Sequence, residues 1–193
     1  MTNKYESFNL EIEDNIANII LSRPEQLNSM SRKFWVELPE ILEEVNRNSE
    51  IRVLIISSTG KHFCAGMDLS AFDNGVANIP KEKRPDNARI GEALYRSARE
   101  LQEYISKLEK IRVPVIAAIH GGCIGGAVDL VTACDIRLAT TDAFFCIQEI
   151  NIGMAADVGT LQRLPRIIPD SKMRELAYTC LLYTSDAADD SLR

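Results

Sequence analysis

A short apolar segment followed by glycines constrains the fold more than any other feature. Residues Val113 to Ile119 are rich in β-branched side chains, and His-Gly-Gly follows them. Such a run predicts a buried strand that ends at glycine. A second pair, Gly125-Gly126, precedes apolar residues at helical spacing. Strand, glycine-rich turn and helix together direct backbone N–H groups and the positive end of a helix dipole toward one place, which predicts a ligand site there.

Strands and helices are expected to alternate along the rest of the chain. Polar and apolar residues alternate near the N-terminus, which predicts a β-hairpin over 8–12 and 16–21. Ser31 is a suitable N-cap, and Pro39 inside the following helical run predicts either one bent helix or two. Further strands are expected at 52–57, 113–119, 136–139 and 144–147, and further helices at 90–110, after Asp157 and from Ser171. This order predicts an α/β fold with some parallel pairing.

The composition predicts one globular domain from a reducing compartment. A chain of 193 residues that is 46% hydrophobic can bury a sizeable core. Its net charge of −6 gives no general attraction to nucleic acid or to an anionic membrane. The five cysteines stand singly, without the spacing of metal ligands, and the sequence shows neither a signal peptide nor a membrane-spanning run. We therefore expect a cytoplasmic protein without a metal, nucleic-acid or membrane partner.

Three carboxylates stand among apolar residues at Asp129, Glu149 and Asp157. Acids in such surroundings are costly to bury unless they are paired, hydrogen-bonded or used in chemistry, so all three are candidate site residues. Each also has a structural explanation. Asp157 is placed to cap a helix, Asp129 to complement a helix dipole, and Glu149 to occupy an exposed turn.

Two glycine-containing segments have similar chemistry, Cys64–Met67 and Gly122–Gly126. Small residues let a ligand approach the main chain closely, so one N–H group from each segment can converge on a single carbonyl oxygen. Such a pair of donors would form an oxyanion hole. The two histidines, His62 and His120, are expected to fix the backbone of these loops rather than to act as bases.

Five segments carry a resemblance to a known family: Ser22–Asn28, His62–Leu69, Pro114–Gly122, Gly125–Asp129 and Ala133–Arg137. Together they resemble the enoyl-CoA hydratase/isomerase (crotonase) superfamily up to about residue 180. The resemblance implies an α/β spiral of ββα units, an acyl-CoA thioester substrate and a role in fatty-acid β-oxidation. It also implies a homotrimer or hexamer for a full-length chain, and no separate cofactor, because coenzyme A is part of the substrate.

The same resemblance implies roles for individual residues. The N–H groups of Met67 and Gly126 would form the oxyanion hole. The residues expected to contact substrate are Ala65, Gly66, Met67, Asp68, Leu69 and Gly126. Hydratases of the superfamily would carry glutamates at positions 129 and 149, whereas this chain has Asp129, Glu149 and a third acid, Asp157.

This set of acids, with the segment Ala155–Pro165, resembles the Δ3,5-Δ2,4-dienoyl-CoA isomerase branch. Ala127 departs from the branch, which usually has a third glycine there. The resemblance implies that Glu149 acts at the carbon next to the thioester carbonyl, that Asp157 acts at the far carbon, and that Asp129 orients the pair. The alternatives are an enoyl-CoA hydratase, a Δ3-Δ2-enoyl-CoA isomerase, and a non-catalytic fragment or assembly subunit.

The C-terminal end does not fit the pattern that precedes it. Residues 181–193 are small and acidic and have no periodicity, which predicts a non-native tail. Residues 1–180 would then be a core without the C-terminal helices that the superfamily usually has. A natural chain that continues beyond either end would make a peroxisomal or mitochondrial location the alternative to the cytoplasm.

Overall fold

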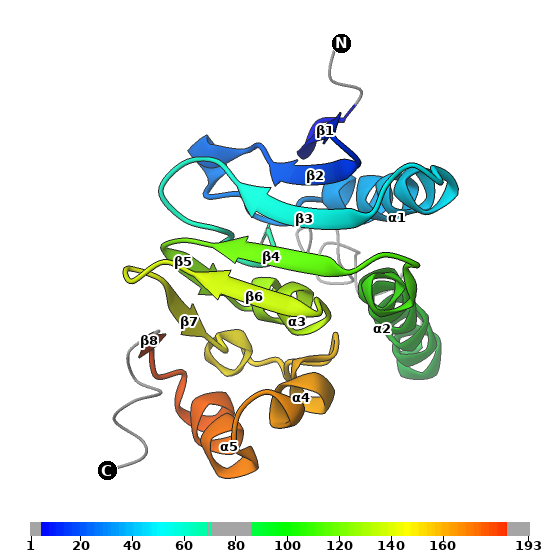
Figure 1. The fold of residues 1–193 in the computed structure, drawn as a ribbon. Helices are drawn as coiled ribbons and strands as arrows, with labels where there is room; N and C mark the ends of the chain where they lie inside the picture. Colours follow the sequence, from blue (N-terminus) through cyan, green and yellow to red (C-terminus); the bar gives the residue numbers. More distant parts are fainter. Residues whose placement is uncertain (1–4, 69, 71–85, 185–193) are drawn as a thin grey trace.

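Two β-sheets form the framework of the chain (Figure 1). The computed structural model describes residues 5–68, 70 and 86–184. The larger sheet has the order β1-β2-β3-β4-β6, and its members are β1 (Phe8–Glu13), β2 (Ile16–Leu21), β3 (Val53–Ser58), β4 (Val115–Ile119) and β6 (Ile136–Ala139). The smaller sheet has the order β5-β7-β8, with β5 (Gly122–Ile124), β7 (Phe144–Cys146) and β8 (Tyr183–Thr184). All neighbours pair in parallel except β1 with β2 and β7 with β8.

Helices alternate with strands or pairs of strands along most of the chain. They are α1 (Arg32–Arg47), α2 (Asn87–Lys110), α3 (Gly126–Thr132), α4 (Thr160–Arg163) and α5 (Asp170–Thr179), with short 3-10 turns η1 (Pro24–Gln26), η5 (Glu149–Ile152) and η6 (Leu164–Arg166). The orders β1-β2-α1, β4-β5-α3 and β6-β7-α4 confirm the predicted α/β fold of repeated ββα units. Over the described ranges, no helix combines the length and the apolar character that crossing a bilayer requires.

The N-terminal hairpin is confirmed, and its turn explains it. Asp14 and Asn15 join β1 to β2 with φ angles of +48° and +66°. Asn and Asp tolerate this left-handed region better than most residues, and such a turn matches the twist of the flanking strands. The register then pairs Phe8 with Leu21 and Glu13 with Ile16.

Helix α1 is continuous despite Pro39. Ser31 caps it as predicted, because its Oγ accepts a hydrogen bond from the Phe34 N–H at 3.3 Å. The proline removes one internal hydrogen bond, yet Leu38 and Ile41 on either side of it are fully buried. Burial of this apolar face offsets the missing bond, so a single helix forms rather than two.

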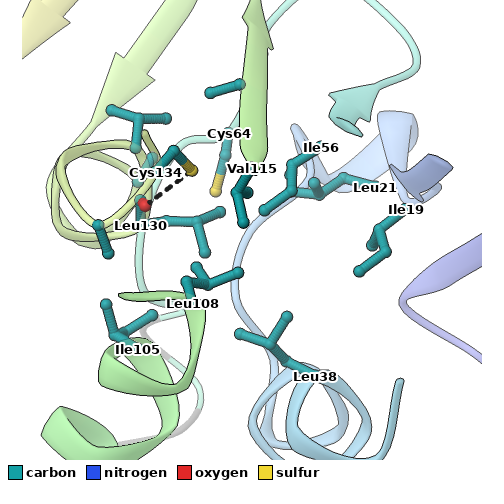
Figure 2. Packing of buried hydrophobic residues seen from close by; sticks show 14 of the residues in the cluster. Ile19, Leu21, Leu38, Ile56, Cys64, Ile105, Leu108, Val115, Leu130 and Cys134 are labelled. Atoms are coloured by element: carbon teal, nitrogen blue, oxygen red, sulfur yellow. Dashed lines mark hydrogen bonds between the residues drawn. The ribbon is translucent and has the colours of Figure 1, made fainter. Parts of the chain in front are cut away.

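The main core lies between the larger sheet and helices α1 and α2 (Figure 2). Strand residues such as Ile56 and Val115 meet Leu38 of α1 and Leu108 of α2. Leu94 of α2 has the helical spacing of Leu101, Ile105 and Leu108, which predicts that it points inward, and this prediction is wrong, because its side chain is 66% exposed. That part of α2 borders a cavity instead of the core.

Tertiary pairing changes two other boundaries. Gly122–Ile124, expected as part of a loop, is strand β5, because it pairs with β7 on one side and Cys64 bridges to Cys123 on the other. Helix α2 begins at Asn87, earlier than expected, since Asp86 caps it through the Arg89 N–H at 3.0 Å. Tyr183–Thr184 pairs with β7, whereas residues 185–193 lie outside the described residues, so the origin of the tail stays a prediction.

The contacts of Glu37 lead to a prediction about the stability of the fold. This α1 carboxylate is only 7% exposed and accepts the Glu6 and Ser7 N–H groups, both at 2.9 Å. We expect Glu37→Ala to lower the free energy of unfolding by about 2 kcal/mol, because the buried Ser7 N–H and the partly buried Glu6 N–H lose a charged acceptor. Urea unfolding measures the change. The exposed neighbour provides the control: Glu40→Ala should change stability by less than about 0.5 kcal/mol, and an equal effect of both would contradict this role.

Candidate active site

The segment from Cys64 to Asp68 is hydrogen-bonded along both edges. On one edge the Met30 N–H donates to the Gly66 carbonyl at 2.8 Å, and the Asp68 N–H donates to the Met30 carbonyl at 3.1 Å. On the other edge the Cys64 N–H donates to Gly122 at 3.1 Å, and the Ile124 N–H donates to Cys64 at 3.0 Å. The structure therefore brings the two glycine-containing segments into direct contact.

This pairing leaves two N–H groups side by side. Met30 bonds to the residues on either side of Met67, so the Met67 N–H faces the opposite edge. Gly126 opens α3, and a Cβ atom added to it would lie 3.9 Å from the Met67 nitrogen. Neither N–H has an acceptor among the described residues. They are therefore available as a pair of donors.

Gly66 makes this approach possible. Its φ of +85° lies in the left-handed region, and a Cβ there would lie 2.6 Å from the Ile124 carbonyl oxygen and 3.3 Å from the Gly126 nitrogen. A side chain at this position would collide with backbone, so only glycine brings the two segments together.

A cavity of about 510 Å³ opens beside the two N–H groups. One wall comes from α2, and Trp35 of α1 contributes to another. The predicted site residues that line it are Ala65, Gly66, Met67, Gly126, Asp129, Glu149 and Asp157. The structure thus gathers all three acids and both proposed donors around one space.

Asp129 is the most buried of the three acids. It is 1% exposed, and burial raises its pKa to about 6. Its Oδ1 accepts the Thr160 N–H at 2.6 Å, and this bond, like the charge of Arg163, opposes the shift. Thr160 is the first residue of α4, so Asp129 caps a different helix from its own. This contact joins α3 to the segment that carries Asp157.

Glu149 is the first residue of η5 and is half-buried rather than exposed. Its Oε1 lies against the backbone, because a Cβ on Gly125 would be 3.4 Å from it. Its Oε2 is buried without a hydrogen-bond partner among the described residues. Burial raises the pKa of Glu149 to about 7, with a smaller contribution from the charge of Asp129. A carboxyl group that titrates near neutral pH suits a general base.

Asp157 lines the cavity with an exposed side chain. The helix-cap explanation for it is wrong, because the N-cap residue of α4 is Gly159 rather than Asp157. Instead, the carbonyl of Asp157 accepts a hydrogen bond from Gln102 Nε2 of α2 at 2.7 Å. Sequence reasoning did not identify Gln102, since its partner lies 55 residues away.

Asp68 is held by polar partners outside the cavity. Among the described residues it is not part of the cavity lining, and its Oδ1 accepts hydrogen bonds from the N–H and Oγ of Ser70 at 3.0 and 2.7 Å. The other predicted contact, Leu69, lies outside the described residues.

The histidines near the site bind backbone groups of the loops, and the cysteines near it are buried. His62 Nδ1 accepts the Gly122 N–H at 3.0 Å, and His120 Nε2 lies 2.9 Å from the Gly60 carbonyl, in agreement with a role in fixing the loops. Burial raises the pKa of Cys64 to about 12 and that of Cys123 well above its usual range, so both thiols stay protonated. Across 5–68, 70 and 86–184, no group of three His, Cys, Asp or Glu side chains is arranged to hold a metal ion.

The pKa of Glu149 leads to a prediction about stability. Between its ordinary value of 4.5 and its folded value of about 7, the folded chain holds a proton that the unfolded chain has released. The free energy of unfolding should therefore fall as the pH rises through this window. Glu149→Gln cannot ionise, and we expect it to be more stable than the unaltered chain by about 1–2 kcal/mol at about pH 8, after allowance for solvent screening.

This advantage should disappear at about pH 4, where the unaltered side chain is protonated in both states. Urea unfolding at the two pH values measures it. Glu103→Gln, on the exposed side of α2, is the matched control and should show no such pH dependence. A destabilised Glu149→Gln at the higher pH would contradict the unpaired, buried carboxylate.

Known proteins match nearly the whole length of this chain. The model of the enoyl-CoA hydratase/isomerase family matches residues 11–191. The peroxisomal Delta(3,5)-Delta(2,4)-dienoyl-CoA isomerase of Arabidopsis thaliana is 42% identical over 178 residues, which cover 92% of this chain and 63% of that protein. The mitochondrial Delta(3,5)-Delta(2,4)-dienoyl-CoA isomerase of Rattus norvegicus is 43% identical over 189 residues, which cover 97% of this chain and 57% of that protein.

Solved structures show the same fold. The enoyl-CoA hydratase of Bacillus anthracis superposes with a TM-score of 0.80 at 29% identity, covering 96% of this chain and 67% of that one. The chain spans 63% and 57% of the length of the two dienoyl-CoA isomerases. The match to the family model covers most of the sequence, and the chain belongs to the enoyl-CoA hydratase/isomerase family.

Proposed function

We propose that the protein converts 3,5-dienoyl-CoA thioesters to 2,4-dienoyl-CoA thioesters. The observation that carries the proposal is the placement of Glu149 and Asp157 on one cavity beside the N–H groups of Met67 and Gly126. The names of relatives that are 42% and 43% identical support it. Those names also say peroxisomal and mitochondrial, which supports a compartment of fatty-acid oxidation over the predicted cytoplasmic location.

The proposed reaction is a proton transfer over a conjugated chain. The Glu149 carboxylate removes a proton from carbon 2, next to the thioester carbonyl. The electron pair moves into a dienolate whose oxygen the Met67 and Gly126 N–H groups stabilise. Asp157 in its acid form gives a proton to carbon 6, and the double bonds move from positions 3 and 5 to positions 2 and 4.

Two acids are needed because carbons 2 and 6 are too far apart for one carboxyl group to serve both. Glu149, with a pKa raised to about 7 by burial, suits the role of base at carbon 2, since the base must be partly ionised near neutral pH. Asp129 supports the pair by holding the N-terminus of α4, through its 2.6 Å bond to the Thr160 N–H. All of the proton movements are assigned to side chains of the protein, so the scheme contains no metal and no separate cofactor. The homotrimer or hexamer stays a prediction.

The first test asks whether the two acids take part in catalysis rather than in substrate binding. We expect Glu149→Gln and Asp157→Asn each to lower isomerisation of a 3,5-dienoyl-CoA by about 10²- to 10⁴-fold, because each removes one proton-transfer group. Binding of the thioester should change little. The absorbance of the conjugated product gives the rate, and calorimetry gives the affinity.

Glu103→Gln is the control acid in this assay as well, because it is exposed on α2. Near-normal turnover by Asp157→Asn would remove the dienoyl assignment. Hydration of a 2-enoyl-CoA at a comparable rate by the unaltered chain would favour the hydratase alternative.

The second test concerns the oxyanion hole. Gly126→Pro deletes the N–H donor at the first position of α3, where proline is compatible with a helix. We expect a loss of about 10²- to 10³-fold in turnover, with a much smaller loss of thioester affinity. Gly126→Ala is the matched control, because it keeps the N–H and adds only a Cβ that would lie 3.0 Å from Met30 Sδ. Equal losses from both substitutions would mean that the position matters for space alone.

A further inference from the structure

Three polar residues of α2 face the segment that carries Asp157. Gln102, Ser106 and Glu109 are spaced by four and three residues, so they lie on one side of the helix. Gln102 Nε2 donates to the Asp157 carbonyl at 2.7 Å. Ser106 and Glu109 bind a single guanidinium group, that of Arg163 at the end of α4.

Arg163 connects α2 to the residue after Asp157. Its Nη1 donates to the Val158 carbonyl at 3.1 Å, and its Nη2 donates to Ser106 Oγ at 2.9 Å. Its Nε and Nη2 donate to Glu109 Oε2 at 2.9 and 2.7 Å. The arginine side chain is 11% exposed, whereas the side chain of its partner Glu109 is 40% exposed. The guanidinium also occupies the space over Gly159, where a Cβ would lie 1.6 Å from Nη1.

The carbonyls of Asp157 and Val158 thus both accept hydrogen bonds from side chains. The donor to Asp157 lies on α2, and the donor to Val158 is Arg163, which is itself bound to α2. The Asp157 carboxylate accepts no hydrogen bond among the described residues, so its place at the cavity follows from its main chain and its own side-chain rotamer. The same helix supplies the cavity wall next to it through Leu94, Ala98 and Leu101. Any shift of Asp157 relative to α2 would therefore move the acid relative to a bound acyl chain.

We propose that Gln102 and the Arg163–Glu109 pair are positioning residues that set where Asp157 delivers its proton. The proposal rests on the proposed isomerase function. It adds which residues hold Asp157 in place for its proton transfer. Glu149 has no part in this network, since it lies on η5 and packs against Gly125. Loss of the network should therefore affect the far carbon and spare carbon 2.

The experiment measures the two proton transfers separately on one substrate. A 3,5-dienoyl-CoA is incubated with the chain in D₂O, and isomerisation is followed together with deuterium uptake at carbon 2 of the recovered substrate. For Gln102→Met and Arg163→Lys we expect isomerisation to fall about 10- to 100-fold, because small displacements of a reacting group have effects of this size. Exchange at carbon 2 should stay within about twofold, since it needs only Glu149 and the oxyanion hole.

Gln162→Met is the matched control. Gln162 is exposed and borders the same polar cavity of about 350 Å³ as Gln102, Glu109 and Arg163, but its side chain makes no hydrogen bond within the described part of the chain. It should leave both rates unchanged. Gln102→Met keeps the side-chain volume and removes the donor to Asp157, together with the acceptor of a 3.5 Å contact from Arg99 Nη1. It therefore provides the test even where Arg163→Lys weakens the fold.

The outcomes separate this proposal from the function on which it rests. A parallel loss of isomerisation and exchange in Gln102→Met, or no loss of either, would overturn the positioning role. Absence of isomerisation by the unaltered chain, or full isomerisation by Asp157→Asn, would instead overturn the proposed function. A raised ratio of exchange to isomerisation in Gln102→Met, with the Gln162→Met ratio unchanged, is the expected result.

Discussion

The site depends on the backbone hydrogen bonds along both edges of Cys64–Asp68. They fix a short extended segment between Met30 and β5, although the segment belongs to neither sheet. Because N–H groups alternate in direction along such a segment, the bonds that hold Gly66 and Asp68 also turn the Met67 N–H away from Met30. The start of α3 lies against it only because Gly66 has no side chain. Formation of the donor pair is therefore a direct result of folding and needs no ligand.

Burial of the acids around the cavity lowers the stability of the folded chain. Asp129 and Glu149 are both harder to ionise than in water, because their surroundings are largely apolar. Asp129 is partly compensated by the Thr160 N–H, whereas the Oε2 of Glu149 has no described partner. Glu149, whose burial is less compensated by hydrogen bonds, is also the proposed base. Unfavourable burial of this kind is common at sites where a carboxyl group must accept a proton near neutral pH.

Local features of the sequence predicted much of the fold. The Asp14-Asn15 turn, the Ser31 cap and the β-branched strands depend on neighbouring residues, and the structure has all of them. The glycine segments and the three acids were also identified, because their residue types carry the chemistry. The position of Leu94 could not be predicted, since a cavity wall and a core have the same helical spacing.

Long-range partners account for the other failures. Strand β5 forms because β7 and Cys64 pair with it, and neither pairing is visible in three residues of sequence. Gln102 and Arg163 look like ordinary polar residues of two helices, and their contacts join parts of the chain 54 to 57 residues apart. Asp157 resembled a helix cap because it precedes α4, yet Asp129 on another helix makes the capping bond.

That capping bond makes the side chain at position 129 and the start of α4 depend on each other. The Asp129 carboxylate reaches the Thr160 N–H at 2.6 Å, which leaves no room for a longer side chain with the same backbone. A glutamate at position 129 would have to push α4 away or turn its carboxylate elsewhere, and either change would move the segment that holds Asp157. The identity of the acid at 129 and the sequence of 157–160 should therefore vary together among relatives. A change of reaction within the family would then require coordinated substitutions, because either one alone would leave α4 without its cap or Asp157 out of place.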